Sequence, residues 1–93
     1  MRDIFSLRDD LNQTTVDFLM TDLNTGIMLA RVAMGAKQDS PRQTRNTRNA
    51  RLAYETVLRF RKKIQATSAV KDMLDEKLGR LRSMLEALGE SFA

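Results

Sequence analysis

Apolar residues recur at steps of three and four in three stretches of this 93-residue chain, and this spacing constrains the fold more than any other feature. Such steps return a side chain to the same face of an α-helix, so each stretch predicts one helix with a buried stripe. The first stripe consists of Val16, Met20, Leu23, Ile27, Ala30 and Met34. The second consists of Ala50, Ala53, Val57, Phe60 and Ile64, widened by Tyr54. The third consists of Val70, Leu74, Leu78, Leu81, Leu85 and Leu88.

Start and stop signals separate the stripes. Gly35 favours an end to the first helix, and Ser40-Pro41 favours the start of the second, with Ser as N-cap and Pro at the first helical position. Thr67-Ser68 caps the third helix, and Gly89 stops it. The predicted helices cover residues of about 15–36, 41–66 and 68–89.

The sequence offers two candidate start positions for the first helix. Thr14 with Asp17 three positions later resembles a capping box and predicts a start near residue 15. Thr21-Asp22 is a second signal and predicts a start near residue 21. We favour the longer helix, because its stripe is unbroken from Val16, and we expect Gly26 to weaken it in either case.

Residues 1–13 contain Ile4, Phe5, Leu7 and Leu11 and are interpreted as a short helical arm that docks on the bundle. Short links force successive helices to run antiparallel, and stripes of this kind suit packing at about 20°. The sequence therefore predicts one domain over residues 1–93, an all-α antiparallel three-helix bundle with a short N-terminal helical arm.

The composition removes several chemistries. Without Cys the chain has no disulfide, thiolate nucleophile or sulfur ligand, and without His it lacks the usual proton shuttle and the commonest metal ligand. The acidic residues are scattered in small sets, such as the adjacent pairs Asp9-Asp10 and Asp75-Glu76, whose side chains diverge by about 100° on a helix. We therefore expect no catalytic site, no metal site, no cofactor and no small-molecule substrate.

No apolar run approaches the roughly 18 residues that a membrane span needs. The start Met1-Arg2-Asp3 lacks the apolar stretch of a signal peptide. A cytoplasmic location is the expectation.

Positive charge is concentrated in the second predicted helix. Residues 37–64 hold nine basic and two acidic residues, a net charge of +7, whereas residues 1–36 carry −2 and residues 65–93 carry −1. The side opposite the apolar stripe carries six candidate contacts for nucleic acid or another anion: Arg45, Arg48, Arg51, Arg59, Lys62 and Lys63. This face is either a phosphate-binding surface or simply the solvated side of the helix.

Two observations favour the solvated side. Tyr54 and Phe60 belong to the apolar stripe, so no stacking aromatic is expected among the arginines. No known nucleic-acid-binding motif is present.

Some residues depart from the pattern. Arg61 and Lys77 fall on apolar sides, and we expect each to extend along the core edge to an acid on a neighbouring helix. Leu52 lies among the basic residues, either as an isolated exposed side chain or as a contact for the arm or a second subunit. Five methionines are expected mainly to fill gaps in or beside the core: Met20, Met28, Met34, Met73 and Met84.

The segment from Ala50 through Tyr54 to Phe60 resembles the second helix of microtubule-interacting-and-transport (MIT) domains and of tetratricopeptide repeats. Leu74, Lys77, Leu81 and the run Leu85-Glu86-Ala87-Leu88 are similar to the third MIT helix. The likeness covers about half of the chain, with a longer link before the second helix than in that family. It implies a three-helix scaffold that binds a partner's amphipathic helix in a groove between helices.

These observations predict a small non-enzymatic protein-interaction module. It would bind a partner helix, or self-associate, through apolar seams between its helices. The alternative is auxiliary binding of nucleic acid or another anionic surface through the basic face.

Overall fold

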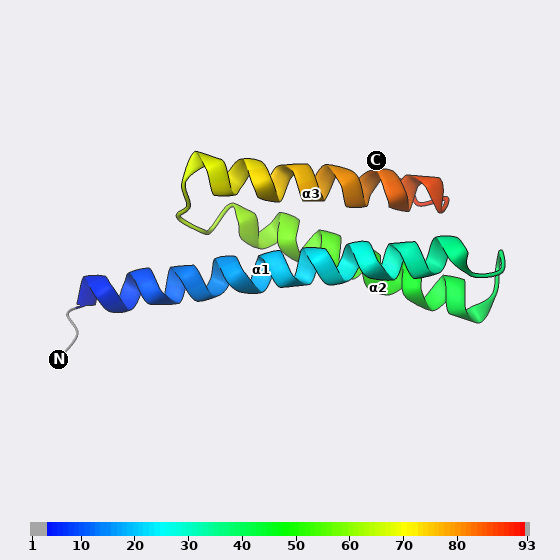
Figure 1. The fold of residues 1–93 in the computed structure, drawn as a ribbon, viewed down its shortest axis with the longest axis horizontal. Helices are drawn as coiled ribbons and strands as arrows, with labels where there is room; N and C mark the ends of the chain where they lie inside the picture. Colours follow the sequence, from blue (N-terminus) through cyan, green and yellow to red (C-terminus); the bar gives the residue numbers. More distant parts are fainter. Residues whose placement is uncertain (1–3, 93) are drawn as a thin grey trace.

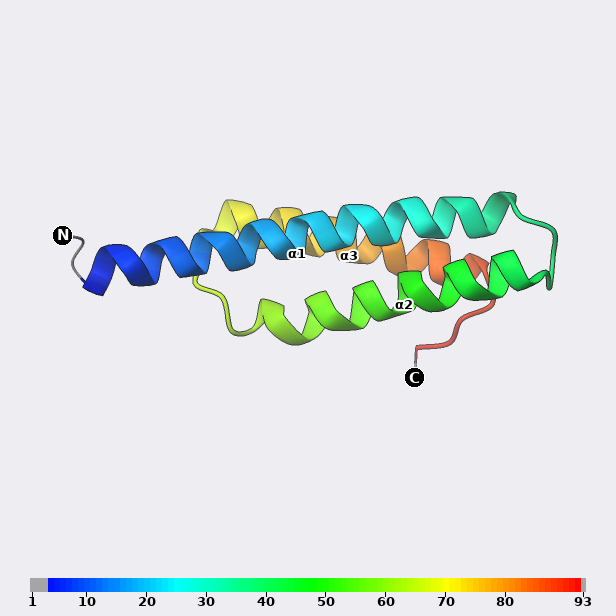
Figure 2. The same cartoon turned by 90° about the horizontal axis from the view of Figure 1, so that it is seen from below.

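The structure, a computed structural model, describes residues 4–92, with side chains from residue 11 onward. It contains three α-helices: α1 (Ile4–Gly35), α2 (Pro41–Arg61) and α3 (Ser68–Ala87). Successive helices run antiparallel, and all three contact one another in an elongated bundle of 55 × 23 × 19 Å (Figures 1 and 2). The described residues contain no strand, and the predicted three-helix bundle is confirmed.

The start of α2 follows the predicted chemistry. Ser40 is extended (φ −71°, ψ 156°), and its side-chain oxygen accepts a hydrogen bond from the Gln43 amide at 3.2 Å. The Gln43 side chain in turn accepts from the Asp39 amide at 2.8 Å and donates to the Ala33 carbonyl at 3.2 Å. The polar first turns of α2 are thereby attached to the end of α1.

Both ends of α3 also carry the predicted signals. Thr67 is the N-cap, and its hydroxyl accepts from the Val70 amide at 3.2 Å. At the other end Gly89 adopts φ 93°, and the Glu90 amide donates to the Leu85 carbonyl at 2.9 Å. This pairing is a Schellman motif, which reverses the chain so that residues 90–92 return toward α2 (Figure 2).

Two helix boundaries differ from the prediction. The helix α1 begins at Ile4, so residues 4–13 continue it rather than forming a separate element, and its N-terminal end extends past α3 (Figure 1). Residues 1–3 and the side chains of Ile4, Phe5 and Leu7, which were expected to dock, lie outside the described part. The helix α2 ends at Arg61 and not near residue 66.

The earlier end of α2 has a physical reason in the link that follows. The Asn12 side chain donates to the Gln65 carbonyl and accepts from the Gln65 amide at 2.9 Å. A backbone paired with a side chain of α1 cannot also continue the α2 hydrogen-bond ladder. Ile64 remains buried in this non-helical link.

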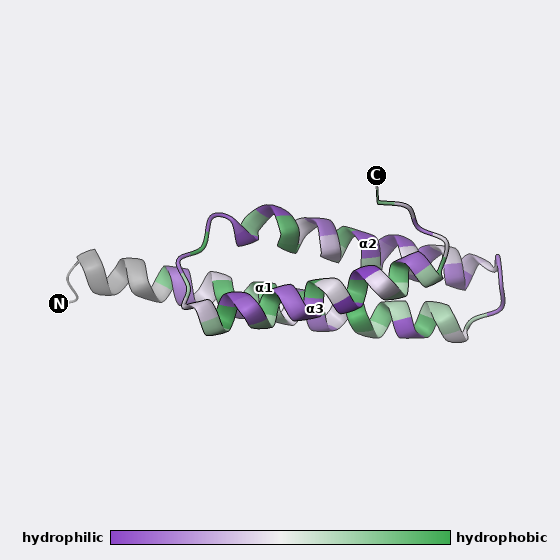
Figure 3. Cartoon of the chain, turned by 90° about the horizontal axis from the view of Figure 1, so that it is seen from above, coloured by the Kyte–Doolittle hydropathy of each residue, from purple (hydrophilic) through white to green (hydrophobic). Residues whose placement is uncertain are grey.

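The core lies along the axis of the bundle, where the three helices meet. It is formed by Val16, Leu19, Leu23, Ile27, Ala30, Ala33, Ala50, Ala53, Tyr54, Val57, Ile64, Leu74, Leu78, Leu81 and Leu85. Figure 3 shows both hydrophobic (green) and hydrophilic (purple) segments on each of the three helices, as expected for amphipathic elements.

The predicted stripes were wrong at their margins. Leu19 and Ala33 are buried in α1, whereas Met20 is only partly buried and Met34 is exposed. Phe60 was assigned to the α2 stripe but is 38% exposed. Steps of three and four leave two neighbouring residues as candidates for the same face, and only the position of the adjacent helices decides between them.

Candidate functional site

The six basic candidates of the second helix fall into two groups in the structure: five are exposed, and one, Arg51, is paired within the chain. Arg45, Arg48, Arg59 and Lys62 are exposed, and among the side chains that the structure describes none of the four forms an ion pair or a hydrogen bond through its charged group. Lys63 is also exposed, and its ammonium lies 5.3 Å from the centre of the Phe60 ring. These five residues are therefore available to a partner.

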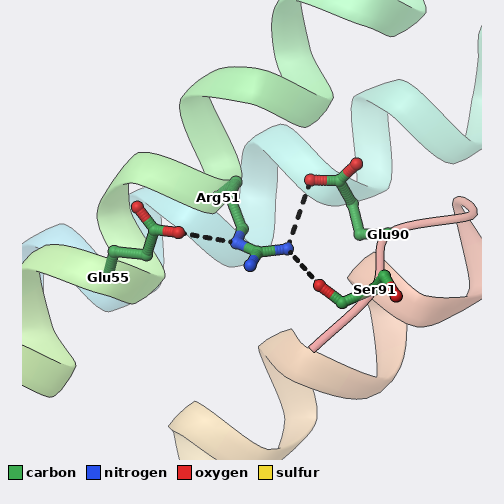
Figure 4. A network of polar contacts seen from close by, with 4 residues as sticks. All are labelled: Arg51, Glu55, Glu90 and Ser91. Carbon is green, nitrogen blue, oxygen red and sulfur yellow. Dashed lines mark hydrogen bonds and ion pairs between the residues drawn. The ribbon is translucent and has the colours of Figure 1, made fainter. Parts of the chain in front are cut away.

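Arg51, the sixth candidate, binds the chain's own residues (Figure 4). Its Nε donates to Glu55 Oε1 at 2.9 Å, one helical turn further along α2. Its Nη1 donates to the Ser91 carbonyl at 3.0 Å and lies 3.4 Å from Glu90 Oε1. With 26% of its side chain exposed, Arg51 holds the C-terminal segment against α2.

The same segment places an aromatic ring between two arginines. The Arg51 Cζ lies 4.0 Å from the centre of the Phe92 ring, and the Arg82 Cζ lies 5.0 Å from it. Phe92 also meets the Tyr54 ring edge-on, with centroids 5.1 Å apart and an interplanar angle of 71°. We call the surface formed by Arg51, Tyr54 and Arg82 the tail cleft.

A hollow of about 380 Å³, with both polar and apolar walls, adjoins the tail cleft. Its walls come from the link before α2, from α2 itself and from the end of α3: Asp39, Gln43, Thr44, Thr47, Arg48, Arg51, Leu52, Leu88 and Glu90. Leu52 is 55% exposed at this edge. Leu52, the apolar residue that the sequence places among basic residues, therefore borders this hollow.

An apolar groove of about 310 Å³ opens between α1 and the last turn of α2. It is lined by Thr14, Thr15, Phe18, Leu19 and Phe60. Phe18 is 60% exposed and Phe60 38%, whereas Leu19 is buried. Phe60 was not expected near the basic face, yet it is exposed and in contact range of Lys63.

The two charged residues on apolar sides find partners on neighbouring helices. Arg61 forms a two-pronged ion pair with Asp75 of α3, as predicted, with Nη2 at 2.7 Å from Oδ2. This hydrogen bonding, reinforced by the charges of Asp75 and Asp72, raises the pKa of Arg61. Lys77 donates to the amide oxygen of Asn24 in α1 at 2.7 Å, so its partner is an amide rather than the acid that was expected.

The methionines are distributed differently from the prediction. Met20 and Met84 are partly buried against the core. Met28, Met34 and Met73 are exposed, so most of the five do not fill gaps in the core.

Among the described side chains, those of residues 11–92, metal-binding groups do not gather in sets of three or more. No helix in the described part of the chain is long and apolar enough to cross a membrane. No protein-family model, curated protein or solved structure matches the chain. The arrangement of side chains is therefore the basis for a functional proposal.

Proposed function

We propose that this chain is a small non-enzymatic protein-interaction module that binds an amphipathic helix, from a partner or a second copy, in the groove between α1 and α2. The observation that carries the proposal is the pair of exposed rings, Phe18 and Phe60, that line this groove together with buried Leu19. Apolar seams between helices are a common place for a further helix to bind.

The energetics of the groove suit an apolar ligand. Fully burying a Phe side chain contributes about 1.5–3 kcal/mol, and these two rings are only partly covered by the chain itself. The Thr15 hydroxyl donates to the Leu11 carbonyl at 3.0 Å, so it brings no unpaired donor into the groove. Aromatic side chains in a pocket with few polar groups are typical of the residues that dominate binding energy.

The groove's surroundings also suit a helix that carries acidic residues on its polar face. Arg59, Lys62 and Lys63 lie at or near the turn of α2 that contributes Phe60. The MIT-like pattern of the second helix supports the same mode of binding. The fold therefore offers apolar contacts for affinity and basic groups for orientation.

The test compares Phe18→Ser and Phe60→Ser with Met28→Ser, another exposed apolar position of α1 that does not line the groove. If the occupant is a second copy, we expect the two groove variants to lose self-association in sedimentation equilibrium. If the occupant is a partner helix, we expect them to lose the crosslink that a photo-crosslinker at position 15 forms with that partner. Met28→Ser should retain whichever activity the parent has. Circular dichroism serves as the folding control, and equal behaviour of all three variants would contradict the proposal.

A second candidate is binding of nucleic acid or another anionic surface by the basic face. It is favoured by the unpaired state of Arg45, Arg48, Arg59 and Lys62 in the described chain and by exposed Phe60 beside Lys63. A single aromatic offers little stacking surface, so we rank this candidate second.

Salt dependence separates the two candidates. Phosphate binding predicts a log–log slope of about −0.9 per phosphate neutralised on duplex DNA, and loss of binding when the four residues are changed to Glu. If the protein binds through the apolar groove, we expect only weak DNA binding at about 150 mM salt. Changing the four basic residues to Glu should then have little effect on self-association, because apolar burial supplies the affinity. Submicromolar, salt-sensitive DNA binding that the fourfold change abolishes would reverse our ranking.

A further inference from the structure

The C-terminal segment is bound as a peptide ligand would be. After Gly89 reverses the chain, Glu90, Ser91 and Phe92 contact the tail cleft without regular secondary structure of their own. The contacts are a carboxylate on Arg51, a backbone carbonyl on Arg51 and a ring on Tyr54. Charged, backbone and aromatic contacts on three successive residues are the elements of recognition of a short peptide.

We propose that the tail cleft is a docking site for a segment of a partner protein in which an acidic residue precedes an aromatic residue by two positions. In the free chain Glu90 and Phe92 occupy this site. The proposal goes beyond the helix-binding groove, because the two surfaces share no residues.

The adjoining hollow indicates how a partner would displace the chain's own segment. A tethered segment competes at an effective concentration in the millimolar range, so a partner with identical contacts would bind poorly. The hollow offers two further groups, the unpaired guanidinium of Arg48 and the exposed side chain of Leu52. A partner segment with an additional acidic and an additional apolar residue reaches both, and the C-terminal segment leaves them unused.

The unoccupied site can be produced in the full chain. The double variant Glu90→Gln, Phe92→Ala removes the carboxylate and the ring of the internal ligand while it keeps the Schellman turn at Gly89. The probe is a fluorescent peptide with the sequence Leu-Gly-Glu-Ser-Phe of residues 88–92. Its affinity is measured by anisotropy against the wild type and the double variant.

We expect the peptide to bind the double variant at least about tenfold more tightly than the wild type, because the internal ligand no longer competes. Arg51→Ala in the double variant should weaken binding by about tenfold, through loss of the ion pair and the cation–π contact. Arg42→Ala is the matched control, since Arg42 is an exposed arginine of the same helix that lines neither the hollow nor the apolar groove, and it should leave the affinity unchanged.

Three results would overturn the proposal. The first is equal or undetectable peptide binding by the wild type and the double variant at millimolar peptide. The second is equal loss with Arg51→Ala and Arg42→Ala, which would indicate nonspecific attraction. The third is a wild-type dimer that Phe92→Ala abolishes, which would assign the cleft to the tail of a second copy. If Arg51→Ala lowers helicity, Arg82→Ala on α3 tests the same ring contact from the other side.

Discussion

The Cβ atom that Gly26 lacks would lie 2.9 Å from the Cβ of Ala53 and 3.0 Å from a methyl carbon of Leu81. Among the described glycines, only Gly26 has atoms of both other helices this close to the position of its missing Cβ. From the sequence alone, Gly26 was expected only to weaken the helix. In the structure its missing side chain leaves room for Ala53 of α2 and Leu81 of α3.

Gly26→Ala should destabilise the bundle. Replacing Gly by Ala inside a helix ordinarily stabilises it by about 0.5–1 kcal/mol. Here the added methyl group meets a helix side chain that cannot rotate away, and overpacking costs about 1–3 kcal/mol. Gly79→Ala in α3 is the control, because nothing lies within 4 Å of the added atom, and it should raise the free energy of unfolding in urea. A stabilised Gly26→Ala variant would mean that the helices are free to separate.

Leu81→Ala should lower the free energy of unfolding by about 2–5 kcal/mol, through lost apolar transfer and the cavity that remains. Leu81 is fully buried between the helices. Leu52→Ala removes the same atoms from an exposed position and should change stability by less than about 0.5 kcal/mol. Similar urea midpoints for the two variants would refute the assignment of Leu81 to the core.

Ser40→Ala should cost about 1 kcal/mol, because the Gln43 amide then loses its hydrogen-bond acceptor. The loss is measured from thermal or urea unfolding. Ser83, an exposed residue inside α3, is the matched position, and Ser83→Ala should be neutral or slightly stabilising. If both changes have the same effect, the cap contributes nothing specific.

Asp22→Asn tests the electrostatics of α1. Partial burial raises the pKa of the Asp22 carboxyl, so the unfolded chain loses this proton more readily than the folded chain. The contribution of Asp22 to stability is then fully present below its unfolded pKa and is lost as the pH rises through its folded pKa.

The Asn variant should therefore melt above the parent at about pH 7, and the difference should shrink toward about pH 3. Glu76→Gln, at an exposed position of α3, controls for the loss of one negative charge. A difference in melting temperature that is independent of pH would contradict the assignment to burial.

The extent to which the sequence predicts this structure can be read from particular residues. Leu23, Val57 and Leu74 were placed correctly, because a stripe over several turns defines a buried face with little ambiguity. Ser40 and Thr67 were placed correctly, because caps act through neighbouring backbone groups. The predicted start of α1 near residue 15 was wrong, because a polar pair such as Thr14 and Asp17 fits inside a long helix as well as at its start.

The candidate sites were less predictable, because they depend on contacts between distant segments. The pair Arg51 and Glu55 could have been anticipated from their spacing of four residues on one helix. The contact of Arg51 with Phe92 joins residues 41 positions apart and follows from the turn at Gly89, which the sequence marks only as a helix stop. Exposure of Phe60 depends on where α1 lies, which a stripe on α2 does not specify.

The pairing of Asn12 with Gln65 makes two distant parts of the chain open together. The Gln65 amide belongs to a link without regular structure, yet its proton is held by a side chain of α1. Unwinding of α1 past Asn12 therefore also releases the link between α2 and α3, whereas fraying of the turns before Asn12 leaves that link closed. In hydrogen exchange the Gln65 amide should therefore exchange together with the α1 amides around Asn12, so this loop opens with that turn of α1.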